Sequence, residues 1–357
     1  PSSGLFMAVL VQATITGKSF IRGNIEFTLT ANLTARGRLR QDAKGSPRFS
    51  PRNCHISIVS VTSSLPSRMR PKVVSKVLHS NLQKVLLALL CPAVDVVFNL
   101  VNAKFVTVTS EIPLGTAGTL QYALLRPPLT SERFIELDLK TILHQMEGKK
   151  VDFPMDQLSL VSLPPKMDAV TQLILSAGLL SAGLSVLQEN FDLEISNNMV
   201  LGLPPLVTTT LRVLIPEISR VLPPSRPVVI DMRATKAPVV TITSDKSFVQ
   251  LFSTAEFRVA PSDSTPESLF VLDVQSNLEA EFDVSEEKLR LSLTLRRCGV
   301  MGHSQAHLPL SVFQELPLKR VLADIIHVSY VPWINRVLRA GIPLPNLLGI
   351  TYHQANI

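Results

Sequence analysis

The stretch IEFTLTANLTAR, residues 25–36, alternates apolar and polar side chains with a period of two. Side chains alternate across a β-strand, so this pattern predicts a strand with one buried face and one solvated face. The sequon Asn32-Leu33-Thr34 lies in this stretch, and Asn32 belongs to the solvated face, where an N-linked glycan can be accommodated. The segment therefore predicts a one-sided β-sheet in a glycosylated protein of the secretory route.

The same alternation recurs in three later segments, residues 135–140, 278–283 and 289–296. Residues 285–288, between the last two segments, are typical of a hairpin turn. Strands with one wet face are typical of antiparallel sheets. Together with three helical segments, these strands predict an α+β fold.

The first helical segment has apolar residues at helical spacing between Val73 and Leu90. Pro71 suits the start of this helix, and Pro92 is expected to end it. The apolar stripe is wide, so we expect other elements to cover most of the helix.

Two further helices are predicted in the C-terminal half. One spans residues 168–188 with Asp168 as a candidate N-cap. It is too polar for a membrane span and is expected to be buried. Small residues interrupt its apolar stripe, which indicates either close packing against a sheet or space left for a ligand. The other helix spans residues 318–340, where Pro332 is expected to kink or break it and Gly341 to end it.

The length of 357 residues is enough for two domains, and a composition of 46% apolar but only 5% aromatic residues predicts an aliphatic interior. Residues 148–167 contain three prolines and are typical of a linker. We therefore expect one domain in residues 1–147 and another in residues 168–357. A short echo favours two related modules, because Ile-Pro-Leu follows the first helix at 112–114 and the third at 342–344.

Three cysteines occur, and in a secreted protein an odd count indicates one disulfide and one free thiol. Cys54 and Cys91 are the nearest in sequence. A bridge between them would close a loop of about 38 residues and contribute about 3–4 kcal/mol. Cys298 would then be a free and buried thiol.

No motif in the chain indicates catalysis. Residues 302–306, GHSQA, are close to a G-x-S-x-G nucleophile elbow, but the last glycine is missing and Pro309 opposes the helix that should follow Ser304. His303 and His307 are four residues apart, yet neither a helix nor a nearby carboxylate favours a zinc site. The chain also lacks a glycine-rich phosphate loop. We expect no enzyme activity, no metal site and no cofactor.

The chain carries a formal net charge of +7, and a basic cluster follows the first quoted strand. One interpretation is a solvated hairpin end. The other is an anion-contacting tip, with Arg36, Arg38 and Arg40 as the candidate anion ligands. Aromatic residues are not interleaved with these charges, which argues against nucleic-acid binding. The cluster consists of Arg36, Arg38, Arg40, Lys44, Arg48 and Arg52.

The order and spacing of several segments resemble the bactericidal/permeability-increasing protein family, and most closely its long PLUNC branch, BPI fold-containing family B. The resemblance covers nearly the whole chain, and it leads us to expect that roughly the first quarter of the family's pattern, including a signal peptide, is missing from this sequence. The segments that carry it are residues 32–42, residues 45–48 with Cys54, LLCPAVD at 89–95, FIELDL at 134–139, LLSAGLSVL at 179–187 and GIPLP at 341–345.

This resemblance implies a boomerang of two barrels joined by a central sheet and a proline-rich linker. Each barrel would be a twisted antiparallel sheet wrapped around long helices, and each can hold a phospholipid-like ligand in an apolar pocket. The resemblance also implies a disulfide between Cys54 and Cys91, and it gives Cys298 no role.

Our leading hypothesis from the sequence is a non-catalytic protein that binds a phospholipid or another acyl lipid and acts in mucosal or innate-immune secretions. The alternative is a surface that binds lipopolysaccharide, an anionic membrane or a host partner through the basic cluster. The protein is expected to be secreted, or else retained in the endoplasmic reticulum or secretory pathway. A lipid hydrolase that uses Ser304 is the least favoured hypothesis. The candidate lipid contacts are Leu173, Ala177, Leu180, Leu184, Val321, Ile325 and Ile334.

Overall fold

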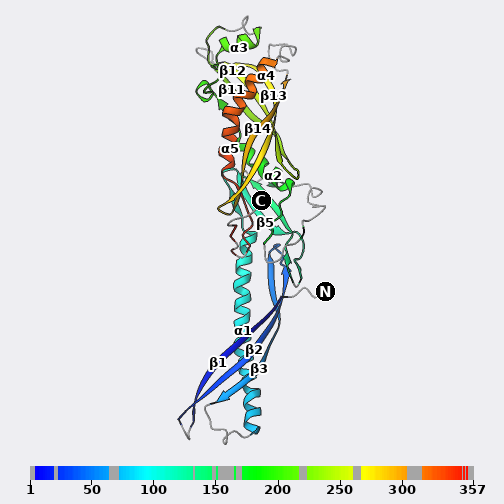
Figure 1. The fold of residues 1–357 in the computed structure, drawn as a ribbon, viewed down its shortest axis with the longest axis vertical. Coiled ribbons are helices and arrows are strands. Elements are labelled where there is room, and N and C mark those ends of the chain that lie inside the picture. Colours follow the sequence, from blue (N-terminus) through cyan, green and yellow to red (C-terminus); the bar gives the residue numbers. More distant parts are fainter. Residues whose placement is uncertain are drawn as a thin grey trace. The chain divides into compact units, whose positions relative to one another are not determined.

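The computed structural model of the chain is a mixed α+β fold with antiparallel sheets (Figure 1). Two compact units are present. The first comprises residues 1–110, 122–140 and 345–350, and the second comprises residues 111–121, 141–344 and 351–357. The structure describes residues 5–19, 23–63, 72–131, 133–146, 150–151, 165, 171–216, 223–259, 267–303, 316–347, 349 and 351–352.

The first unit contains a three-stranded antiparallel sheet, the N-terminal sheet, in the order β1 (Leu5–Ser19), β2 (Gly23–Gln41) and β3 (Pro47–Ser63). Odd-numbered residues of β2 from Leu29 to Leu39 are buried, whereas the even-numbered ones from Glu26 to Arg40 are partly or fully exposed. The strand predicted from residues 25–36 is therefore confirmed, with Asn32 on the solvated side. We call that side the outer face of the N-terminal sheet.

Helix α1 (Lys72–Val106) covers the buried side of this sheet and packs against β3. A Cβ built on Gly37 of β2 would lie 3.0 Å from the ring of Phe98, so the helix approaches the sheet closely at this glycine. The ring of Phe49 on β3 lies 6.0 Å from that of Phe98 and 5.7 Å from that of Phe105.

Our expectation that Pro92 ends this helix is wrong, because α1 continues past it to Val106. A proline inside a helix costs about 3 kcal/mol. The next turns bury Val94, Phe98 and Phe105, and each such side chain contributes about 1.5–3 kcal/mol. Packing against the sheet therefore outweighs the lost backbone hydrogen bond.

The expectation that α1 is mostly covered is also wrong among the residues that the structure describes. The helix packs mainly against β3, and it leaves Val85, Leu89, Val96 and Leu100 exposed. The segment His79–Thr109 is long and apolar enough to cross a membrane by length and composition, and it is the one such helix in the described part of the chain.

Short elements follow α1: η2 (Thr107–Thr109), a four-stranded sheet in the order β4 (Ile112–Leu114), β5 (Gly118–Leu124), β8 (Leu139–Gln145) and β9 (Lys150–Val151), and a pair formed by β6 (Leu129–Thr130) and β7 (Ile135–Glu136). The single strand predicted at residues 135–140 is thus divided between β7 and β8. The division occurs where Arg126 pairs with Glu136 and Asp138. Of the predicted linker 148–167, Lys150 and Val151 pair with β8, and the rest, apart from Pro165, lies outside the described residues.

The second unit is built on a six-stranded antiparallel sheet, the C-terminal sheet. Its order is β10 (Leu193–Ile195), β11 (Val228–Ile242), β12 (Ser247–Val259), β13 (Glu267–Ser285), β14 (Lys288–His303) and β15 (Ile342–Pro343). The predicted hairpin is confirmed: Ser285 pairs with Lys288, and the turn residues Glu286 and Glu287 have φ of 53° and 60°, the conformation of a two-residue hairpin loop.

Helix α2 (Ala177–Leu187) packs against β11 and is shorter than expected. Asp168 lies outside the described residues, and the N-cap is Ser176, whose side chain accepts a hydrogen bond from Leu179 N–H at 3.1 Å. The small residues support close packing, because a Cβ on Gly183 would lie 2.9 Å from Ile342 and Ser181 Oγ accepts from Val240 N–H. The short elements η4 (Gln188–Asn190), η5 (Asn197–Met199) and α3 (Thr208–Leu214) follow.

The last helical segment runs as α4 (Leu316–Ile325), the π-helical turn η8 (Ile326–Tyr330) and α5 (Val331–Leu338). Pro332 was expected to kink or break this helix, but it is the second residue of α5, with one residue between it and the end of the π turn. The wider turn accommodates the proline ring and its missing N–H. Gly341, with φ of 67°, follows the helix end as predicted.

Candidate functional sites

A small apolar cavity lies in the second unit between α3, α4 and β12. Its volume of about 10 Å³ leaves room for no more than about one water molecule. Val321 and Ile325 of α4 line one side, facing Leu211 and Leu214 of α3. Phe257 of β12 also lines the cavity, and its ring stacks on Phe270 with centroids 4.5 Å apart.

Hydrogen bonds hold the first turn of α3, which forms one wall of the cavity. Thr208 Oγ1 donates to Pro223 C=O at 2.8 Å and accepts from Arg226 N–H at 3.0 Å. Thr209 Oγ1 accepts from Ser225 N–H at 2.9 Å. These bonds fix the start of α3 to the segment before β11, whereas the side chains that line the cavity between α3 and α4 are apolar apart from Thr210.

Only two of the predicted lipid contacts, Val321 and Ile325, meet in this cavity. Leu180 and Leu184 of α2 and Ile334 of α5 are fully buried in the core. Ala177 begins α2, and Leu173 precedes it outside any helix, so the structure does not gather the predicted set in one place.

The chemistry available in the cavity is that of an apolar surface. Thr210 contributes the one polar side chain among its lining residues, and no acid, base or thiol lines it. The described residues contain no cluster of His, Cys, Asp or Glu able to hold a metal ion. Ser304 and His307 lie outside the described residues, as does the side chain of His303.

A row of arginines on the outer face of the N-terminal sheet is the main charged feature of the first unit. Arg36, Arg38 and Arg40 alternate along β2, and Arg48 of β3 lies directly opposite Arg40. All four side chains are exposed, and within the described part of the chain they form no ion pair. We call these four residues the arginine row. It brings together the three candidate anion ligands predicted from the sequence.

Asn32 lies on the same outer face, between Leu10 of β1 and Ser57 of β3. The third residue of its sequon, Thr34, donates its hydroxyl to His55 C=O at 3.3 Å. The sequon therefore lies in the middle of a strand whose backbone is paired on both sides.

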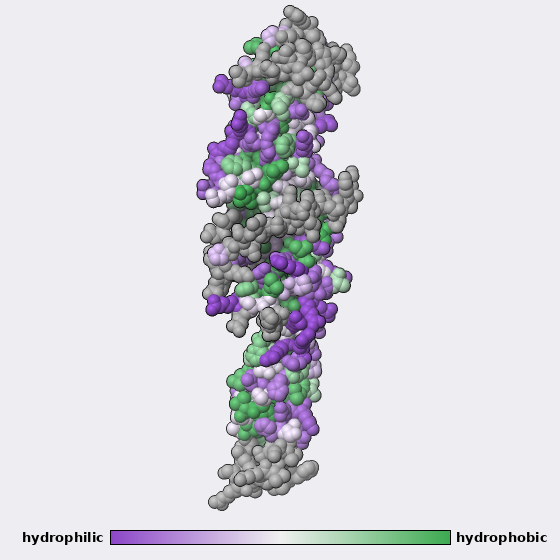
Figure 2. Space-filling view, turned by 90° about the vertical axis from the view of Figure 1, so that its right-hand side faces the viewer, coloured by the Kyte–Doolittle hydropathy of each residue, from purple (hydrophilic) through white to green (hydrophobic). Residues whose placement is uncertain are grey.

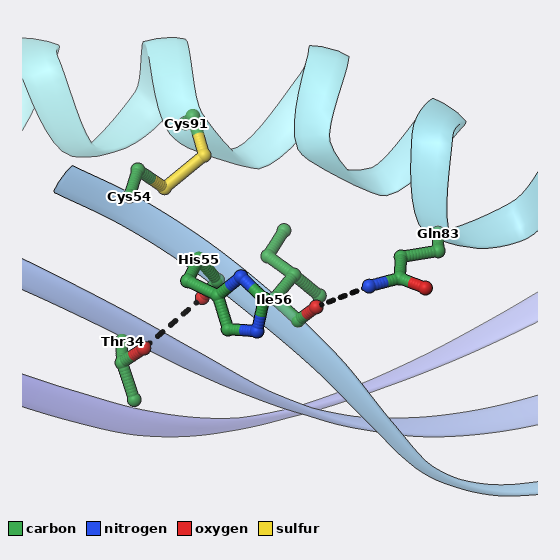
Figure 3. Close-up of a disulfide and its surroundings, with 6 residues drawn as sticks. All are labelled: Thr34, Cys54, His55, Ile56, Gln83 and Cys91. Atoms are coloured by element: carbon green, nitrogen blue, oxygen red, sulfur yellow. Dashed lines mark hydrogen bonds between the residues drawn. A yellow bond between two sulfur atoms is a disulfide. The ribbon is translucent and has the colours of Figure 1, made fainter.

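The disulfide between Cys54 and Cys91 is present and joins β3 to α1 (Figure 3). Further along the same helix, Gln83 Nε2 donates to Ile56 C=O at 2.9 Å, so a covalent link and a hydrogen bond both tie β3 to α1. Cys298 is a free thiol on β14 opposite Ser276, as expected, but it is half-buried and not fully buried. Burial raises the pKa of this thiol to about 11.

An ion-pair cluster on the C-terminal sheet was not predicted from the sequence. Buried Asp231 accepts from Arg233 at 2.8 Å and from Arg258 at 3.0 Å, and Arg258 also pairs with Glu194 at 3.2 Å. The hydrogen bond with Asp231 raises the pKa of Arg233. These residues come from three strands, so spacing along one strand gives no signal of the cluster. Its charges compensate one another, which makes it a structural network.

Comparison with known proteins matches both halves of the chain to domains of the same protein family. The N-terminal domain of the LBP / BPI / CETP family matches residues 1–102, and the C-terminal domain of that family matches residues 115–357. Human BPI fold-containing family B member 6 is 36% identical over 359 residues, which cover 100% of this chain and 79% of that protein.

Two further proteins match nearly the whole length of this chain. Mouse BPI fold-containing family B member 3 is 31% identical over 354 residues, covering 99% of this chain and 74% of that protein. A crystal structure of lipopolysaccharide binding protein aligns with a TM-score of 0.47 at 17% identity, covering 96% of this chain and 77% of that chain.

Proposed function

Because the chain belongs to the LBP / BPI / CETP family, we propose that it is a non-catalytic lipid-binding protein that holds the acyl chains of a phospholipid-like molecule in an apolar pocket. The proposal includes two lipid-holding barrels, one in residues 1–147 and one in residues 168–357, joined by residues 148–167. The protein would act in mucosal or innate-immune secretions, and its disulfide is consistent with an oxidising compartment.

The observation that carries this function is the aliphatic lining shared by α3, α4 and β12. An acyl chain needs far more room than the present cavity of about 10 Å³. Displacement of α3 from α4 would provide that room, because the side chains that line the cavity are apolar apart from Thr210 and could exchange their contacts with one another for contacts with the acyl chain. The hydrogen bonds of Thr208 and Thr209 would keep the first turn of α3 in place during the displacement.

The test is native mass spectrometry of the full chain, purified without detergent, before and after incubation with phosphatidylcholine. Val321→Phe places a bulkier side chain in the cavity lining, and overpacking of this kind typically costs about 1–3 kcal/mol. We expect it to lower the amount of bound lipid about tenfold. The matched control is Val213→Phe on α3, where the side chain is exposed and absent from the lining. If no lipid co-purifies and none can be loaded, the proposal is wrong.

The arginine row favours a second function, binding of lipopolysaccharide or an anionic partner at the surface. Three exposed guanidinium groups on alternate residues of one strand present their charge on one side. Replacement of Arg36, Arg38 and Arg40 by serine should abolish lipopolysaccharide binding and its salt dependence. Serine at three exposed arginines of the second unit, Arg320, Arg336 and Arg339, is the matched control. If the variant with serine at Arg36, Arg38 and Arg40 binds lipopolysaccharide unchanged, the arginine row is only a solvated edge of the sheet and this second function is wrong.

A further inference from the structure

Asn32 and the arginine row occupy the same face of the same strand. Asn32 and Arg36 are four positions apart on β2 and both lie on the outer face, which corresponds to about 13 Å along an extended strand. A group attached at Asn32 therefore lies beside the arginines, and it does not project from a different side of the molecule.

Exposed apolar side chains from β1 complete this face. Phe6 pairs in register with Arg36, and Leu10 pairs with Asn32. Phe6 is 58% exposed and Leu10 is 69% exposed. The Arg36 guanidinium carbon lies 5.9 Å from the centre of the Phe6 ring, so the basic and apolar parts of the face are in contact. Figure 2 shows apolar patches next to hydrophilic residues in its lower part, where Figure 1 places this sheet together with α1 and its own exposed apolar side chains.

The positive charges of this face favour binding of a negatively charged partner. Arg40 and Arg48 are directly opposite each other in the ladder, and like charges in this position repel. Asp42, close in sequence to both, uses its carboxylate to accept hydrogen bonds from Lys44 N–H and Ser46 N–H in the turn. Apolar side chains beside unpaired arginines fit the surface of an anionic bilayer, which accepts both kinds of group.

We propose that the outer face of the N-terminal sheet docks onto anionic bilayers, and that an N-glycan on Asn32 prevents this docking. The proposal rests on the second function above, and it adds a defined partner and a modification that controls access. A glycan is bulky and hydrated. Attached opposite Leu10, it would cover the apolar side chain and hold the arginines away from the lipid phosphates.

The position of the sequon determines when the modification occurs. The backbone of Asn32 is paired with β1 and β3, and the Thr34 hydroxyl is bonded to His55 C=O. A glycosylating enzyme has to bind the sequon as a free segment, so it must act before the sheet forms. Each folded molecule is then fixed in one of two states, glycosylated or able to dock.

The test compares the full chain made in a glycosylating secretory cell with the variants Asn32→Gln and Thr34→Ala, each of which removes the sequon. Binding is measured by co-flotation with phosphatidylcholine vesicles that contain or lack phosphatidylserine. Intact mass reports the glycan. We expect the glycosylated chain to bind phosphatidylserine vesicles at least about tenfold more weakly than both variants. Thr30→Ala, on the same face with the sequon intact, is the control and should remain glycosylated and unbound.

A second comparison separates this inference from the functions on which it rests. In the Asn32→Gln background, replacement of Arg36, Arg38 and Arg40 by serine should weaken vesicle binding about 100-fold. Loss of arginine dependence would overturn both the docking proposal and the anionic-surface function. Arginine-dependent binding that is equal with and without the glycan, or a secreted chain with no glycan on Asn32, would overturn the present inference alone. Lipid retention in the second unit is read separately by mass spectrometry.

Discussion

Asn102 of α1 forms two hydrogen bonds with the backbone of Phe49 on β3. Phe49 N–H donates to Asn102 Oδ1 at 2.7 Å, and Asn102 Nδ2 donates to Phe49 C=O at 2.8 Å. Asn335 of α5 makes the same pair of bonds with Leu293 of β14, at 2.8 and 2.9 Å. In each unit a helical asparagine thus satisfies the backbone groups of a strand residue that lacks a strand partner on that side.

Replacement of Asn102 by leucine should therefore destabilise the first unit. The change leaves one backbone donor and one backbone acceptor of Phe49 without partners, and each such group costs about 1–3 kcal/mol when buried. Hydrogen exchange of the Phe49 amide, measured by NMR, should become faster by a factor of about ten for each 1.4 kcal/mol of lost stability. Asn99→Leu, one turn earlier on the exposed side of α1, is the control and should leave that amide protected. Equal exchange rates in the two variants would show that Asn102 is not needed.

Loss of the disulfide should destabilise the same unit by about 4 kcal/mol, because the bridge closes a loop with a sequence separation of 37. Cys54→Ala with Cys91→Ala should lower the urea midpoint of the transition that reports on α1 and β3. The natural chain should show the same decrease in the presence of a reductant. Cys298→Ala should keep the midpoint of the oxidised chain. A double variant as stable as the natural chain would mean that Gln83 and the packing of Phe98 suffice to hold β3 to α1.

The long strands quoted from the sequence, at residues 25–36, 278–283 and 289–296, were predictable because their pattern is local. Alternation at residues 25–36 reflects one dry and one wet face, and the N-terminal sheet has these two faces. The hairpin at residues 285–288 was equally clear. Its two glutamates adopt positive φ because two long strands pair on either side of them.

The helices were less predictable because their ends depend on distant residues. Pro92 is tolerated since Phe49, far away in sequence, packs against Phe98 and Phe105. The uncovered side of α1 depends on how many strands lie over it, which periodicity within the helix does not reveal. Pro332 is accommodated by a π turn that has no sequence signature of its own.

The candidate sites divide in the same way. The arginine row follows from spacing along one strand and was found. One wall of the cavity was found through Val321 and Ile325, whereas α3 was missed because its seven residues begin with three threonines. Leu211 and Leu214, three residues apart, were the one local signal of that wall.

Alkylation of Cys298 should depend strongly on pH. Burial raises the pKa of this thiol to about 11, so the neutral form dominates at pH 7 and the reactive thiolate is scarce. The rate of reaction with iodoacetamide, read by intact mass, should rise about tenfold per pH unit up to the pKa. Because the folded pKa exceeds the unfolded one, the folded state binds the proton more tightly, and stability should fall as pH rises from about 9 to about 11. Rapid labelling at pH 7 would show that the pKa of the Cys298 thiol is not raised by burial.

Gly341→Ala should destabilise the second unit more than Gly202→Ala. Both glycines have positive φ, 67° and 84°, so each substitution incurs a backbone cost of about 1 kcal/mol. A Cβ at Gly202 meets no atom within 4 Å, whereas one at Gly341 would lie 3.0 Å from Lys288 Cβ and 3.3 Å from Leu289 C=O. That crowding occurs where Ile342 pairs with Leu289, so it should add about 1–2 kcal/mol by separating β15 from β14. Urea unfolding of the two variants measures the difference in the free energy of unfolding. Equal decreases would mean that β14 and β15 can move apart at Gly341 without loss of stability.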